Sequence, residues 1–193
     1  MSSPEIEIAI AKAWEKIEVW YKKNAPSLLR FLNESASDEQ LHELETRIEI
    51  PLPDDYKSSL KIHNGGIDIR SYNYLSTNEV LNTWLVRTEQ SGQGTFEGRE
   101  VFEQGGGVIQ NTWWDHRWIP FAKDSGGNLV CIDMAPAVDG IEGQILYMEI
   151  ASGPVASEYA SFVEWLESYR DDLARGVYGF DAEAGEVLEK FEE

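Results

Sequence analysis

Residues 118–134 read Trp118-Ile-Pro-Phe-Ala-Lys-Asp124-Ser-Gly-Gly-Asn128-Leu-Val-Cys-Ile-Asp-Met134, and this stretch decides the fold class. Two apolar runs flank a turn rich in glycine and asparagine, which tolerate positive φ, so the pattern predicts a β-hairpin. A third apolar run, Ile145 to Ile150, follows a glycine-bearing loop without a helical pattern in between. Parallel strands need a longer crossover connection, so the short spacing predicts an antiparallel meander.

Helical patterns flank this strand region on both sides. Apolar side chains recur three and four positions apart from Ile6 to Tyr21, after a Ser3-Pro4 start signal, which predicts an amphipathic helix. A closing helix with the same periodicity ends at Gly176. Further helix starts are predicted from cap residues at Ser37 with Gln40, at Asp54, at Ser76 with Glu79, and near Ser157. The predicted fold class is therefore α+β, an antiparallel sheet backed by N-terminal and C-terminal helices.

The length and composition favour a single folded domain. The 193 residues are 42% hydrophobic and include 7 Trp, 8 Tyr and 7 Phe, which is enough to build a core without disulfides or metals. We expect one domain over residues 1–180 and an acidic tail over 181–193 with at most one more helical turn. Residues 90–111, rich in Gly and Gln, are expected to form a long loop.

The charge of the chain is strongly negative. Its 16 basic and 35 acidic residues give a formal net charge of -19. Residues 34–55 carry eight acids and one base, and residues 158–193 carry eleven acids and three bases. This charge repels a phosphate backbone, which argues against direct binding of nucleic acid, and it steers a basic protein into encounter. A basic protein partner is the prediction.

The chain carries a single cysteine, Cys131, which cannot form an internal disulfide. The sequence begins without the basic and apolar regions of a signal peptide, and no run approaches 18 apolar residues. We therefore expect a cytoplasmic protein without a membrane span.

Residues for metal or acid–base chemistry are scarce. The three histidines, His42, His63 and His116, show no spacing that places two ligands on one helical face, so no metal is predicted. The glycines near residues 92–107 do not form a nucleotide-binding motif, so no cofactor is predicted. Cys131 lies between Val130 and Ile132, which favours a buried thiol over a nucleophile. No catalytic residue is expected.

The run Trp113-Trp-Asp115-His-Arg-Trp118 is the most unusual local segment. Exposed tryptophans beside polar groups are typical of protein hot spots and of sugar-stacking platforms. Core packing of the same indoles is the competing interpretation. At this stage all three interpretations stay open.

A set of short motifs in a fixed order resembles the SUKH superfamily. These motifs are Trp14-Glu-Lys-Ile17-Glu, Leu41 to Ile50, Leu52-Pro-Asp-Asp-Tyr56-Lys, Asn64-Gly65, Trp118-Ile-Pro, Asp124 to Asn128, Cys-Ile-Asp133, Gly140 to Gln144, and Ser161-Phe-x-x-x-Leu. Together they span roughly residues 10 to 176.

The resemblance implies a curved antiparallel sheet backed by helices, and a binding role without catalytic residues. The superfamily includes the domain of fungal cell-wall synthesis regulators and many bacterial immunity proteins, which neutralise a toxin by binding it. The main hypothesis is an immunity protein whose partner is a basic toxin domain, such as a nuclease. The alternatives are a regulatory scaffold of the cell-wall regulator type and, third, a carbohydrate-binding or small-ligand module.

The expected contacts with the partner come from the acidic regions and the tryptophan run. The predicted partner-binding residues are Asp54, Asp55, Trp113, Trp114, Asp115, Asp171 and Asp172. The loop over residues 90–111 is a further candidate.

Overall fold

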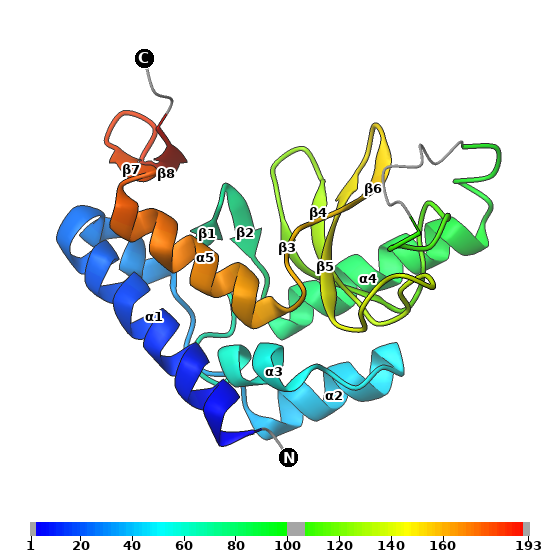
Figure 1. Ribbon diagram of the computed structural model, residues 1–193, viewed down its shortest axis with the longest axis horizontal. Helices are drawn as coiled ribbons and strands as arrows, with labels where there is room; N and C mark the ends of the chain where they lie inside the picture. Colours follow the sequence, from blue (N-terminus) through cyan, green and yellow to red (C-terminus); the bar gives the residue numbers. More distant parts are fainter. Residues whose placement is uncertain (1–2, 100–106, 191–193) are drawn as a thin grey trace.

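The computed structural model describes residues 3–99 and 107–190, and it confirms the predicted α+β class. Six strands form one antiparallel sheet in the order β1-β2-β3-β4-β5-β6, open at both edges, and two more strands, β7 and β8, pair separately. Helices α1, α3 and α5 lie together beside the sheet, with α1 and α5 side by side, while α4 packs against β3 (Figure 1).

The elements follow one another along the described chain as helices, a small hairpin, a helix, the meander and a closing helix with its own hairpin. The helices are α1 (Pro4–Asn24), the 3-10 helix η1 (Pro26–Phe31), α2 (Asp38–Ile48), α3 (Asp54–Leu60), α4 (Thr77–Gly92) and α5 (Phe162–Arg175). The strands are β1 (Asp68–Ile69), β2 (Tyr72–Tyr74), β3 (Trp118–Lys123), β4 (Leu129–Asp133), β5 (Gln144–Glu149), β6 (Gly153–Ala156), β7 (Tyr178–Asp181) and β8 (Glu186–Glu189).

The β3–β4 hairpin forms as the sequence predicts. Trp118 pairs with Asp133 at its open end and Lys123 pairs with Leu129 beside the turn. The Asp124 carboxylate accepts hydrogen bonds of 2.7 Å from both the backbone and the side-chain nitrogen of Asn128, which holds the turn closed. Every residue of β4 is buried, so the sheet is covered on both faces here.

Two of the predicted caps fix helix starts on the N-terminal side, whereas the predicted cap Asp54 is the first residue of α3 and Pro53 occupies the cap position. Ser37 with Gln40 and Ser76 with Glu79 both form complete capping boxes. Asn64 connects the loop after α3 to the start of α4, because its side-chain oxygen accepts a hydrogen bond from the Thr77 backbone nitrogen at 2.8 Å. The next residue, Gly65, has a φ of 80°, and a Cβ there would lie 2.4 Å from the Ser76 nitrogen, so the position requires glycine.

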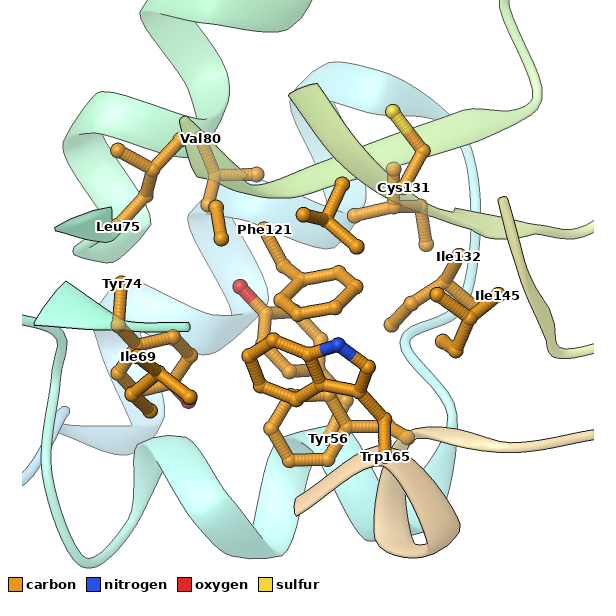
Figure 2. Close-up of a cluster of buried hydrophobic side chains, with 14 of the residues drawn as sticks. Tyr56, Ile69, Tyr74, Leu75, Val80, Phe121, Cys131, Ile132, Ile145 and Trp165 are labelled. Atoms are coloured by element: carbon orange, nitrogen blue, oxygen red, sulfur yellow. The ribbon is translucent and has the colours of Figure 1, made fainter. Parts of the chain in front are cut away.

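Aromatic side chains dominate the core between the sheet and α5. Phe121 on β3 meets Trp165 edge-on at a ring-centroid distance of 4.9 Å, and Tyr56 on α3 lies 5.9 Å from the same phenylalanine. Figure 2 shows these three aromatic side chains gathered in one cluster, with Ile132 and Ile145 beside them. All five side chains are at most 1% exposed, so α3 and α5 are held on the sheet by apolar burial.

The turn between β1 and β2 is built from two residues in left-handed conformation, Arg70 (φ 55°) and Ser71 (φ 65°). Such values are uncommon for residues other than glycine, asparagine and aspartate. The Arg70 side chain reaches α5, where one guanidinium nitrogen donates to Asp172 at 2.6 Å and to Ser168 at 2.8 Å. The rings of Tyr159, Tyr169 and Tyr178 lie within 6.0 Å of the same guanidinium. The arginine therefore anchors the small hairpin to the closing helix.

Three further details differ from the sequence predictions. The closing helix is capped by Ser161, not near Ser157, because Ser157 and Tyr159 are bonded to Ile145 as a continuation of the sheet edge. Helix α4 extends to Gly92, into the segment predicted as a loop, and residues 100–106 of that segment lie outside the described part of the chain.

The third difference concerns the predicted acidic tail. Residues 178–189 form the β7–β8 hairpin instead of a helical turn, with Tyr178 paired to Glu189. Val187 is 4% exposed and Tyr178 is 6% exposed, so the hairpin is packed on the core. Tyr178 and Phe180 alternate along β7, and Val187 of β8 pairs with Phe180.

Candidate partner-binding surface

The structure distributes the predicted partner-binding residues over three separate places. At the first, Asp54 is partly exposed at the start of α3, whereas Asp55 is buried. The Asp55 carboxylate accepts from the backbone nitrogen of Tyr56 at 2.7 Å and from that of Val163 at 2.9 Å. Burial raises the pKa of Asp55, although these backbone donors partly offset the effect. Asp55 therefore joins α3 to the start of α5 and offers no free surface.

The second place is the last turns of α5. Asp172 is 7% exposed and pairs with Arg70 and Arg175. Asp171, next to it, has a side chain that is 57% exposed and is bonded to the Arg170 guanidinium at 2.8 and 2.9 Å. The hydrogen bonds from Arg170 hold the pKa of Asp171 below its usual value. Of this pair, only Asp171 faces outward.

The third place is the tryptophan run between α4 and β3. Trp113 and Trp114 are 7% and 4% exposed, which favours the core-packing interpretation over the two that need exposed indoles. Trp114 donates to Thr88 on α4 at 3.2 Å, because the indole nitrogen needs a partner once it is buried.

Asp115, which follows these two tryptophans, is engaged by a neighbouring base. Although partial burial raises the pKa of Asp115, bidentate hydrogen bonds from Arg117 at 3.1 and 3.2 Å outweigh it and lower the value. Its charge is thus neutralised locally, which leaves little to attract a partner.

Asp171 lines a groove between α1 and α5, which we call the α1–α5 groove. Its volume is about 670 Å³, and apolar atoms form most of its walls. Helix α1 contributes Lys16, Val19, Trp20 and Lys23, and α5 contributes Arg170, Asp171, Leu173 and Ala174. Figure 1 shows the two helices along one side of the molecule, where the other helices leave them uncovered. Val19 is 59% exposed, so a branched apolar side chain points into solvent here.

The α1–α5 groove continues past Trp20 toward the C-terminal hairpin. A second hollow of about 380 Å³ shares Trp20 and Asn24 with it and is further lined by Tyr178, Phe180 and Lys190. The two hollows together form one surface across α1, α5 and β7. The predicted partner-binding set includes no residue of α1, although Lys12, Lys16, Val19 and Lys23 recur at helical spacing on the outer face of this helix.

Other hollows of the described chain are more polar. One of about 520 Å³ lies among the β1–β2 hairpin, the start of α4, the β3–β4 turn and β8. Its carboxylates are Asp68, Glu79, Asp124 and Glu186. Within residues 3–99 and 107–190, no group of three or more His, Cys, Asp or Glu side chains is arranged to hold a metal ion. In the same residues, no helix combines the length and apolarity needed to cross a membrane.

Comparison with known proteins gives a consistent picture. The model of the SMI1 / KNR4 family (SUKH-1) matches residues 35–168, which confirms the resemblance drawn from the motifs. The Neurospora crassa glucan synthesis regulatory protein is 26% identical over 218 aligned residues, covering 92% of this chain and 41% of the relative. The Schizosaccharomyces pombe cell wall biosynthesis/cell cycle regulator smi1 is 25% identical over 202 aligned residues, covering 88% and 40%.

A shorter likeness extends to animal proteins. Human F-box only protein 3 is 40% identical over 57 residues, which cover 30% of this chain and 12% of the relative. The chain spans about two fifths of the length of the two fungal relatives. Helix α1 and the last turns of α5 lie outside the segment matched by the family model, so the α1–α5 groove is built from flanking elements.

Proposed function

Since the chain belongs to the SMI1/KNR4 family (SUKH-1), we propose that it is a non-catalytic protein-binding module that acts as a regulatory scaffold of the cell-wall synthesis regulator type. The observation that carries the proposal is the match of nearly the whole chain to fungal relatives named as regulators of glucan synthesis and cell-wall biosynthesis. No relative in these comparisons is named as an enzyme, which supports the binding role.

The α1–α5 groove is the surface that we assign to this role. It combines an exposed apolar side chain, Val19, with the partly exposed Trp20, and tryptophan is enriched among the residues that dominate binding energy at protein interfaces. Within the predicted set, Asp171 is exposed, Asp54 and Asp115 are partly exposed, and Asp171 belongs to the groove itself.

A replacement experiment tests the regulatory role. In Neurospora crassa, the aligned segment of the glucan synthesis regulatory protein is exchanged for this chain, and growth in the presence of a cell-wall-perturbing dye is compared with the null strain. We expect the exchange to restore growth. Failure to restore growth, with the hybrid protein present at normal abundance, would count against the regulatory role.

A second candidate is the immunity protein of the main sequence hypothesis, and one observation favours it. The net charge of -19 includes exposed acids at the start of α2, Asp38 and Glu39, and at Glu43, which complement a basic toxin domain. Co-expression with the product of the adjacent gene discriminates between the candidates. Protection of cells from that product, together with a stable complex, would replace the regulatory proposal.

A further inference from the structure

We propose that the α1–α5 groove binds an acidic protein segment that carries apolar residues on one face. This inference rests on the proposed binding function and adds the chemistry of the partner. It reverses the expectation drawn from the net charge, which favours a basic partner.

The apolar part of the proposal rests on the floor of the groove. Val19 is 59% exposed, Trp20 beside it is partly exposed, and the exposed Ala174 of α5 lines the opposite wall. Covering these groups removes apolar surface from water, which favours binding by roughly 25 cal/mol per Å² before the costs of association are subtracted. A segment with apolar side chains on one face provides that cover, as in other recognition modes where an amphipathic segment enters a groove.

The acidic part rests on the lysines of α1. Lys12, Lys16 and Lys23 are exposed and recur with Val19 at spacings that place all four on one helical face. In the described part of the chain, no carboxylate lies within ion-pair distance of these three lysines, whereas Lys22, Lys57 and Lys61 each have one. Lys16 and Lys23 therefore line the groove without an ion pair, and Lys12 continues their row one turn earlier on α1.

The charged residues that line the groove are three bases, Lys16, Lys23 and Arg170, and two acids, Glu15 and Asp171, which leaves one positive charge in excess. Arg170 is bonded to Asp171 and to Glu167, which lies outside the lining, and the Lys16 charge also acts on Asp171, so the free positive charge of the groove is that of the lysines. A basic partner would therefore face the lysines directly, and like charges at short distance disfavour binding. An acidic segment finds complementary charge at the groove and repulsion elsewhere, which restricts it to this surface.

Binding of designed peptides to the 193-residue chain tests the proposal. Fluorescence anisotropy compares three fluorescein-labelled peptides of about 18 residues, a length at which a helix can form. The first carries leucines on one helical face and glutamates elsewhere, the second replaces each glutamate with lysine, and the third scrambles the first so that the leucine face is lost. We expect the Kd of the first peptide to be at least about tenfold lower than that of the other two, which corresponds to a difference of about 1.4 kcal/mol in binding free energy.

Two variants with matched controls locate the binding. Val19→Asp adds a charge to the apolar floor, and Val86→Asp makes the same change at a valine on α4 that is 52% exposed. The double variant Lys16→Glu/Lys23→Glu changes the groove charge, and Arg47→Glu/Lys123→Glu makes an equal change at exposed sites elsewhere. We expect each groove variant to lose about tenfold in affinity for the acidic peptide and each control to lose less than twofold.

Three results would overturn the proposal: equal binding of the three peptides, equal losses in groove and control variants, or a Val19-dependent dimer of the free protein in light scattering. Binding of the chain to phosphatidylserine vesicles without binding of the acidic peptide would also overturn the proposal. The variants also separate this inference from the proposed function. If the hybrid regulator works equally well with Val19→Asp and Lys16→Glu/Lys23→Glu, the groove inference fails and the regulatory role stands.

Discussion

Substitution of Arg70 by methionine tests whether the β1–β2 hairpin is anchored to α5 by its ion pair with Asp172. The two side chains are 14% and 10% exposed, and methionine retains most of the apolar stem while it removes the charge. Removal of one partner of a buried pair costs about 3–5 kcal/mol, and Arg175 still contacts Asp172, so we expect a loss near the low end, about 3 kcal/mol. Urea denaturation followed by tryptophan fluorescence measures the change, with an unchanged m-value as the check on two-state unfolding.

A double-mutant cycle isolates the pair from its surroundings. The double variant Arg70→Met/Asp172→Asn should lose about 2 kcal/mol less than the sum of the losses of the two single variants. The reason is that the double variant leaves no buried charge of this pair without its partner. Asp171→Asn is the matched control on the same turn of α5, where the exposed pair with Arg170 should cost less than about 1 kcal/mol. A loss below about 1 kcal/mol for Arg70→Met, or strict additivity in the cycle, would refute the anchoring role.

Three further outcomes follow from the described contacts. Ser37→Ala removes the oxygen that accepts from the Gln40 backbone nitrogen, and it should lower the free energy of unfolding by about 1 kcal/mol in the same urea assay. Burial raises the pKa of the Cys131 thiol, so Ellman's reagent should leave the native protein unmodified and react fully in denaturant; rapid native reaction would contradict this. Burial also raises the pKa of Asp55, so the folded state binds its proton more tightly than the unfolded chain. The free energy of unfolding of the wild type relative to Asp55→Asn should therefore fall as the pH rises through the folded-state pKa, and should be constant below the unfolded-state pKa of about 4. A difference between the two proteins that does not change with pH would contradict the raised pKa of Asp55.

Local signals in the sequence predicted most of the fold. The capping boxes at Ser37 and Ser76 depend on residues three positions apart, and the β3–β4 turn depends on Asp124 and Asn128, four positions apart. Such short-range patterns are readable without the tertiary structure. The closing hairpin was missed because the Asp-Ala-Glu-Ala stretch at 181–184 has good helix formers, and the contacts that select strands come from the distant core.

The candidate surface was predicted less well because burial is set by distant partners. The Asp55 carboxylate is bonded to a nitrogen 108 positions away, and no local pattern distinguishes it from the partly exposed Asp54. Likewise, Asp172 meets Arg70 from the opposite half of the chain, while Asp171 beside it faces solvent. The lysine and valine stripe on α1 was visible in the sequence. Its meaning depended on the position of α5, which only the three-dimensional structure supplies.

The left-handed turn at Arg70 and Ser71 affects the order in which the strands join the sheet during folding. A hairpin with Asn-Gly at these positions would close readily on its own, whereas this one uses residues that resist the required backbone angles. Closure of this hairpin depends on the ion pair between the Arg70 guanidinium and Asp172 of α5, about a hundred residues later in the chain. The chain between the two residues must lose conformational entropy before this ion pair can form. We therefore expect β1 and β2 to join the sheet late in folding and to be among the first strands released when α5 loosens.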